Sequence, residues 1–202
     1  MTIGLIILAG GKSSRMGTNK ALLPVEGKAN IEKILDTLAP SFSHIVLVTN
    51  DQDTYSWLNV PMTSDVYPGQ GPLAGIHAGL LASLAEVNLV VACDMPFVST
   101  TLGNYLVGIS REVDAVVPRW DGQLHPLFAV YRKACAKSIE ECIITGNLRL
   151  VHFLDRLNVR YVEQDELQKV ISSDVVFTNM NNPEEYQMVL DQIVKENKSE
   201  KK

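Results

Sequence analysis

The stretch of sequence that decides the fold is residues 3–20, which read IGLIILAGGKSSRMGTNK. Its apolar start, residues 3–8, predicts a β-strand that is buried on both faces of a sheet. Gly10 and Gly11 then let backbone N–H groups approach a ligand, and consecutive N–H groups in such a turn can bind an anion. The only charged residues among the first 25 are basic: Lys12, Arg15 and Lys20. The stretch therefore predicts a strand followed by a phosphate-binding loop, with a plain strand-to-loop turn as the alternative.

Segments typical of strands and helices alternate along the rest of the chain. Further buried strands are predicted at 44–49, 88–93, 114–118 and 127–131, and helices at 72–85, 133–143, 148–156 and 183–195. Another helix is expected between Asn30, as its cap, and Pro40, which ends it. This alternation predicts an α/β fold, namely a single Rossmann-like, doubly wound and mostly parallel sheet covered on both faces. We expect one domain, residues 1–194, followed by a charged and frayed tail at 195–202.

Composition excludes several classes of protein. The chain has 202 residues, of which 46% are hydrophobic and 20% charged, so bulk disorder, collagen and coiled coil are excluded. Its net charge of −5 argues against a nucleic-acid-binding protein. The three cysteines, Cys93, Cys135 and Cys142, form no C-x-x-C pair, so we expect neither a disulfide nor a zinc site, and a cytoplasmic location. No stretch approaches about 20 apolar residues, so no membrane span is expected.

Polar residues follow several of the predicted strands, at the edge where ligands bind in such a sheet. Asp94 directly follows one of them, and a carboxylate that faces a triphosphate there suits Mg²⁺, which prefers oxygen ligands. Asp65 is expected either to accept hydrogen bonds from a ribose or a guanine, or to form a turn. Gly75 and Gly79 lie on one face of the predicted helix, where either a ligand or close packing against the sheet would explain them.

Five segments resemble motifs of the molybdenum cofactor guanylyltransferase (MobA) family. The segment LAGGKSSRMGTNK at 8–20 resembles the family pattern L-A-G-G-x-S-x-R-M-G-x-D-K, with Asn19 where the family has Asp. The other segments are DVYPGQGPLAGI at 65–76, CDMPF at 93–97, QLHPLFAVY at 123–131 and FTNMNNPEE at 177–185. In the last of these Asn182 replaces a Thr, and it also suits a helix cap before Pro183. The resemblance runs from residue 3 to about residue 190 and implies a fold similar to that of nucleotide-diphospho-sugar transferases.

The resemblance also implies roles for residues at matching positions. It implies that Asp94 binds the Mg²⁺ cofactor, that Asn181 is a substrate-binding residue that reaches the metal or a substrate phosphate, and that Arg15 and Lys20 neutralise the charge that develops on pyrophosphate. The implied catalytic residues are thus Arg15, Lys20 and Asp94, and the implied nucleotide-binding residues are Leu8, Ala9, Gly10, Lys20, Asp65 and Asp94.

The activity that the resemblance implies is the transfer of GMP from GTP to molybdenum-bound molybdopterin, with release of pyrophosphate. It also implies transient contact with proteins of molybdenum cofactor biosynthesis or with apo-molybdoenzymes. Two alternatives remain: a cytidylyltransferase of molybdopterin or another small phosphorylated substrate, and a non-catalytic carrier that binds GTP and the pterin. Ala9–Gly10–Gly11 favours guanine, since cytidylyltransferase relatives often have Ala-Ala-Gly there.

Overall fold

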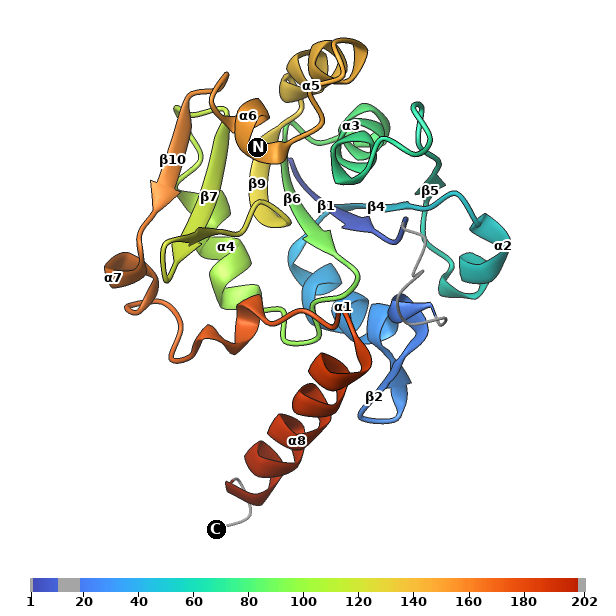
Figure 1. The fold of residues 1–202 in the computed structure, drawn as a ribbon, viewed down its shortest axis with the longest axis vertical. Coiled ribbons are helices and arrows are strands. Elements are labelled where there is room, and N and C mark those ends of the chain that lie inside the picture. Colours follow the sequence, from blue (N-terminus) through green and yellow to red (C-terminus); the bar gives the residue numbers. More distant parts are fainter. Residues whose placement is uncertain (1, 11–18, 200–202) are drawn as a thin grey trace.

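A mostly parallel β-sheet forms the centre of the molecule (Figure 1). The computed structural model describes residues 2–10 and 19–199. The strand order is β10-β7-β9-β6-β1-β4-β5, and β8 pairs with β7. The strands are β1 (Ile3–Leu8), β4 (His44–Val48), β5 (Met62–Thr63), β6 (Val87–Ala92), β7 (Ala115–Trp120), β8 (Gln123–Leu124), β9 (Phe128–Arg132) and β10 (Val159–Val162). β1 pairs in parallel with both β4 and β6, whereas β9 runs antiparallel to β6 and β7, so the predicted fold class is confirmed.

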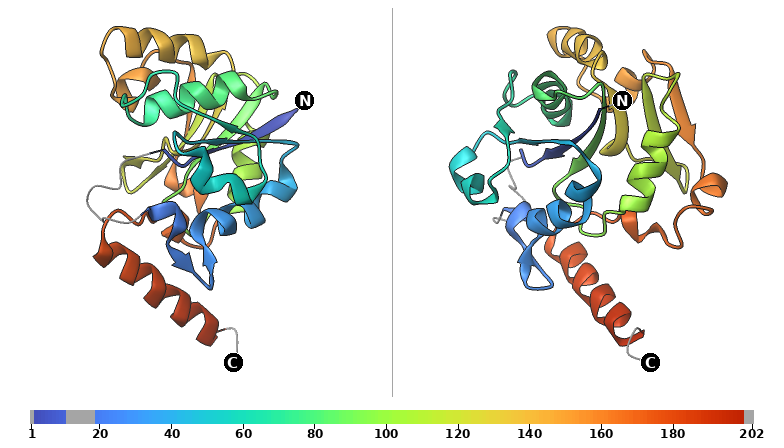
Figure 2. Two further views of the ribbon diagram at one scale, coloured as in Figure 1. Left: turned by 90° about the vertical axis from the view of Figure 1, so that its right-hand side faces the viewer. Right: turned by 180° about the vertical axis from the view of Figure 1, so that it is seen from behind.

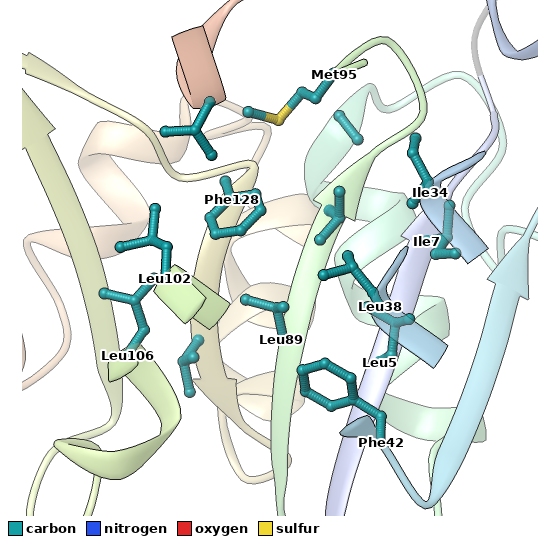
Figure 3. Close-up of a cluster of buried hydrophobic side chains, with 14 of the residues drawn as sticks. Leu5, Ile7, Ile34, Leu38, Phe42, Leu89, Met95, Leu102, Leu106 and Phe128 are labelled. Atoms are coloured by element: carbon teal, nitrogen blue, oxygen red, sulfur yellow. The ribbon is translucent and has the colours of Figure 1, made fainter. Parts of the chain in front are cut away.

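Helices cover both faces of this sheet (Figure 2). α3 (Pro72–Ala82) and α5 (Cys135–Ile144) lie on one face, and α1 (Asn30–Leu38) and α4 (Thr100–Gly108) lie on the other. The strands alternate accordingly: Leu5 and Ile7 of β1 join the cluster under α1 and α4, whereas Ile6 and Leu8 join the cluster under α3 and α5. Figure 3 shows the first cluster, in which Leu5 and Ile7 lie near Ile34 and Leu38. This double burial explains why β1 is apolar at successive positions.

Shorter elements complete the fold. The hairpin of β2 (Pro24–Val25) and β3 (Lys28–Ala29) follows the 3₁₀ turn η1 (Lys20–Leu22). The last helix, α8 (Pro183–Ser199), extends away from the sheet, and its residues Val189 and Ile193 pack with Leu23 and Val25. It runs past the predicted helix end at residue 195. The remaining elements are η2 (Ala39–Ser41), α2 (Gln52–Tyr55), η3 (Ser56–Leu58), α6 (Leu150–Leu154), α7 (Gln164–Leu167) and η4 (Asp174–Phe177).

Two local expectations need correction. Asn30 is not the cap of α1; the cap is Ala29, and the Asn30 side chain donates to the Cys93 carbonyl instead. α4 was not predicted, because its sequence TTLGNYLVG is rich in residues with low helix propensity. The Ser99 side chain caps α4 by accepting from the Leu102 N–H, and burial of the helix against the sheet outweighs that propensity. Within the described chain, no helix is long and apolar enough to cross a membrane.

Candidate active site

The carboxyl ends of β1, β4 and β6 meet at one edge of the sheet. The Ala9 N–H donates to the Val48 carbonyl at 2.9 Å, and the Cys93 N–H donates to the Leu8 carbonyl at 3.0 Å. These bonds join the first residues after β1 and β6 to the neighbouring strands. Gly10 follows in an exposed position, and apart from Gly10 itself and its chain neighbours no atom of the described chain lies within 4 Å of the place where its Cβ would be. The predicted residues Leu8, Ala9 and Gly10 therefore form the start of an open edge.

Lys20, Asp94 and Asn181 come together at this edge from three distant segments. Lys20 Nζ donates to Asn181 Oδ1 at 3.0 Å and lies 3.7 Å from Asp94 Oδ2. The Met180 N–H donates to the Asp94 carbonyl at 2.9 Å, so the segment that leads into α8 is held beside the end of β6 (Figure 1). The side chains of Lys20 and Asp94 keep 19% and 22% exposure, so both remain accessible to a ligand.

The surroundings of Asp94 shift the pKa of its carboxyl in opposite directions. Burial raises the pKa of the Asp94 carboxyl above its ordinary value; Lys20 lowers it, and the negative charge of Glu185 raises it. At 3.7 Å, Lys20 attracts Asp94 without a hydrogen bond of normal length. The arrangement therefore leaves a partly buried carboxylate whose negative charge Lys20 only partly compensates.

Asp65 lies on the β4 side of the same edge, in reciprocal contact with Asn50. Asn50 Nδ2 donates to Asp65 Oδ2 at 2.8 Å, and the Asp65 N–H donates to Asn50 Oδ1 at 2.9 Å. Asn50 orients the Asp65 carboxylate and was not among the predicted site residues. The signal that could have found it is its position two residues after β4, in a polar segment at the ligand-binding edge.

The two helical glycines of α3 are explained by packing. A Cβ on Gly79 would lie 2.4 Å from Ile6 Cγ2, and one on Gly75 would lie 3.3 Å from Leu8 Cδ2. The helix therefore needs glycine to approach β1 closely. This closeness also places the start of α3 near Asp65, whose Oδ1 lies 3.8 Å from the Gly75 Cβ position.

Asn19, which stands where the resembled motif has Asp, anchors the turn that carries Lys20. Its Oδ1 accepts from the Ala21 N–H at 3.1 Å, and its Nδ2 donates to the hydroxyl of Tyr55 at 2.9 Å. Tyr55 is buried, and its burial raises the pKa of the hydroxyl to about 12. The neutral amide thus caps η1 without placing a charge beside a buried side chain. The predicted residue Arg15 lies outside the described residues, as do Gly11 and Lys12.

Asn182 and Glu185 position Asn181 through a capping box at the start of α8. The Glu185 N–H donates to Asn182 Oδ1 at 2.8 Å, and Asn182 Nδ2 donates to Glu185 Oε1 at 2.8 Å, which confirms the predicted cap. Glu185 Oε2 also accepts from the Asn181 N–H at 2.7 Å. Glu185 was missed, although a glutamate three residues after a capping Asn is a recognisable signal.

The donor set at Asp94 fits a hard divalent cation. The Asp94 side chain is 22% exposed and its Oδ2 lies 3.7 Å from Lys20, so its carboxylate remains accessible there. The described residues contain no cluster of three or more His, Cys, Asp or Glu side chains that could enclose a metal alone. Mg²⁺ is usually bound by one or two carboxylates together with substrate phosphates and water, so the accessible carboxylate of Asp94 suits it.

Comparisons with known proteins agree on one family. Residues 5–164 match the model of the MobA-like NTP transferase domain. A probable molybdenum cofactor guanylyltransferase of Pelotomaculum thermopropionicum is 38% identical over 88% of this chain and 87% of its own length. A molybdenum cofactor guanylyltransferase of Desulfosudis oleivorans is 34% identical over 89% and 90%. Among solved structures, molybdopterin-guanine dinucleotide biosynthesis protein A from Archaeoglobus fulgidus is similar with a TM-score of 0.83 and 30% identity, covering 95% of this chain and 99% of that one.

Proposed function

The chain belongs to the MobA-like NTP transferase domain family, and on that premise we propose that it is a molybdenum cofactor guanylyltransferase. The reaction transfers GMP from GTP to molybdenum-bound molybdopterin, which forms molybdopterin guanine dinucleotide and releases pyrophosphate. The observation that carries the proposal is the convergence of Lys20, Asp94 and Asn181 from three segments at the carboxyl edge of the sheet. This combination of a cation, a carboxylate and an amide suits a triphosphate better than an uncharged ligand.

GTP binds across the ends of β1 and β4 in this proposal. The exposed backbone at Gly10, next to the half-buried Ala9, approaches the nucleotide without interference from a side chain of its own. Asp65 is held by Asn50 in a position to accept hydrogen bonds from the ribose hydroxyls or the guanine N–H groups. Lys20 binds the phosphate groups, together with Arg15.

Catalysis depends on position and charge rather than on a general base. The attacking group is the terminal phosphate of the pterin, which is already anionic near neutral pH. Lys20 neutralises negative charge that develops on the leaving pyrophosphate, and its bond to Asn181 orients the ammonium group. Asp94 would hold Mg²⁺, which supplies positive charge to the triphosphate oxygens. Asn181, held beside Lys20 by their hydrogen bond, binds a substrate phosphate or the metal in this proposal.

The cellular compartment in this proposal is the cytoplasm, on the basis of the reaction and of the cysteines. Cys93, Cys135 and Cys142 are free thiols, which supports a reducing, cytoplasmic compartment. The dinucleotide product passes to apo-molybdoenzymes through transient contacts with them or with other proteins of molybdenum cofactor biosynthesis.

The deciding experiment measures pyrophosphate release from GTP with Mg²⁺ and molybdenum-bound molybdopterin, followed by the mass of the product. We expect a product that is heavier than molybdenum-bound molybdopterin by one GMP unit. We also expect the enzyme to prefer GTP when CTP competes at equal concentration. Equal use of CTP would overturn the guanine assignment. Binding of GTP without pyrophosphate release, with the pterin present, would replace the enzyme by a non-catalytic carrier.

A further inference from the structure

Asn30 connects the two segments that carry the charged groups of the site. It is fully buried, as the first residue of α1. Its backbone N–H donates to the Leu23 carbonyl at 3.0 Å, and Leu23 closes the turn that begins at Lys20. Its side-chain Nδ2 donates to the Cys93 carbonyl at 2.8 Å, next to Asp94. One residue therefore binds the Lys20 turn through its main chain and the Asp94 turn through its side chain.

The Asn30 side chain is poorly explained by stability alone. Its Oδ1 is buried and has no hydrogen-bond partner within residues 2–10 and 19–199. The amide cannot be turned around to relieve this, because the Cys93 carbonyl only accepts hydrogen bonds. A buried acceptor without a partner destabilises a fold, and the neighbouring core positions of α1, Ile31 and Ile34, are apolar.

We infer that Asn30 is a positioning residue of the proposed guanylyltransferase. It sets the separation between Lys20 and Asp94. The Lys20 turn is not part of the central sheet, so the sheet alone does not fix its distance from Asp94. The bond from Asn30 to Cys93 supplies that link at one residue from the carboxylate. The inference rests on the proposed function, because it assumes that Lys20 and Asp94 act on one nucleotide.

Asn88 provides a matched control on the same strand that precedes Asp94. It is also a fully buried asparagine, near the amino end of β6, and its Nδ2 donates to the Ala85 carbonyl at 3.0 Å. Its Oδ1 has a partner, because it accepts from the Ser83 hydroxyl. Replacing each asparagine by alanine removes one buried amide at either end of β6, but only the change at Asn30 disturbs the link to Asp94.

The experiment compares Asn30→Ala and Asn88→Ala at a temperature where both remain folded. It measures kcat, the KM for GTP, the Mg²⁺ concentration at half-maximal activity, the affinity for GTP with Mg²⁺ by calorimetry, and the melting temperature. For Asn30→Ala we expect kcat to fall about 10- to 100-fold, because small displacements of charged groups have effects of that size. We also expect a higher Mg²⁺ concentration at half-maximal activity and a weaker affinity for GTP. For Asn88→Ala we expect kcat within about two-fold of wild type and a lower melting temperature than for Asn30→Ala, because its amide makes more hydrogen bonds.

Wild-type kcat and Mg²⁺ dependence in Asn30→Ala, or an equal loss of kcat in both variants, would overturn the inference. If Asn30→Ala does not fold, Asn30→Leu removes the same amide while filling the space, and the same results are expected. If the wild-type chain itself transfers no GMP, the proposed function fails. The calorimetric comparison then still tests the inference, since unchanged Mg²⁺-dependent GTP affinity in Asn30→Ala contradicts it.

Discussion

Buried polar groups lie at both ends of β6, but they differ in how fully their hydrogen-bonding capacity is used. At the amino end, Asn88 donates to the Ala85 carbonyl and accepts from Ser83, whose hydroxyl oxygen also accepts from the Ala85 N–H. At the carboxyl end, burial raises the pKa of Asp94, and the amide oxygen of Asn30 lacks a partner among the described residues. The amino end is thus a closed network, whereas the carboxyl end retains unused hydrogen-bonding and charge capacity.

This difference indicates that the amino end of β6 contributes to stability, whereas its carboxyl end contributes to function. Satisfied buried polar groups contribute to folding, and unsatisfied ones reduce stability. Perturbed ionisable groups that are partly exposed are concentrated at functional sites. We therefore expect substitutions at the carboxyl edge to change activity more than stability, and substitutions at the amino edge to do the reverse.

The largest effect is expected for Asp94→Ala, which removes the carboxylate at the carboxyl edge. We expect kcat to fall by at least about 10³-fold, because charge stabilisation of the triphosphate is lost. Pyrophosphate release with saturating GTP and Mg²⁺ measures this loss. The control is Asp114→Ala at the amino edge, where Asp114 Oδ2 accepts from the Asn158 N–H at 2.9 Å. That variant should melt at a lower temperature with nearly unchanged kcat, and near-native activity of Asp94→Ala would refute the metal assignment.

The next largest effect is expected for Lys20→Ala, at about 10²-fold in kcat, because one positive charge beside the leaving group is lost. Lys133→Ala is the matched control at the amino edge, since Lys133 Nζ donates to the Ser83 carbonyl at 2.6 Å. Steady-state kinetics of both variants provide the measurement. A comparable loss of kcat for the two lysines would show that the edges do not differ in the proposed way.

Two glycines, Gly4 in β1 and Gly10 just after it, test the same difference between the amino and carboxyl edges. A Cβ on Gly4, near the amino end, would lie 2.2 Å from Asn88 Oδ1, whereas one on Gly10 would meet no described atom within 4 Å beyond its own chain neighbours. Gly4→Ala should therefore lower the free energy of unfolding by about 1–3 kcal/mol with little change in KM. Gly10→Ala should leave the melting temperature unchanged and raise the KM for GTP by roughly 10-fold, because a side chain would obstruct the nucleotide. Thermal unfolding and GTP titrations separate these outcomes, and a Gly10→Ala variant with wild-type KM would argue against backbone binding there.

The sequence predicted what depends on local pattern. The apolar runs of β1, β4 and β6 identified the central strands, and the residues that follow them predict a ligand-binding site at the carboxyl edge of the sheet. The cap at Asn182 was predicted for the same reason, since a cap is a contact between residues a few positions apart.

Contacts between distant residues were not predictable in the same way. Asn30 resembles a helix cap in sequence, but its partner Cys93 lies 63 positions away. The contact of Lys20 with Asn181 spans 161 positions and depends on how the segment before α8 crosses the end of β6. α4 was missed because tertiary packing, rather than helix propensity, stabilises it.

The smallest expected effect concerns the pH dependence of stability at the carboxyl edge. Because burial raises the pKa of Asp94, the folded chain binds this proton more tightly than the unfolded chain does. The contribution of Asp94 to the free energy of unfolding therefore decreases as pH rises from the ordinary pKa of aspartate, about 4, through the raised value. Asp94→Asn does not ionise and lacks this decrease.

At pH 7 the melting temperature of Asp94→Asn should therefore exceed that of wild type, because a neutral amide avoids the free-energy cost of burying the charge. The pH-dependent part of this difference should disappear well below about pH 4, where the aspartate is protonated in both the folded and the unfolded chain. Thermal unfolding of both proteins across this pH range tests the sign. Asp114→Asn, at the amino edge, should instead lower the melting temperature at pH 7, because it weakens the acceptor for the Asn158 N–H. A destabilised Asp94→Asn at pH 7 would mean that attraction to Lys20 outweighs burial, and the two edges would then both serve stability.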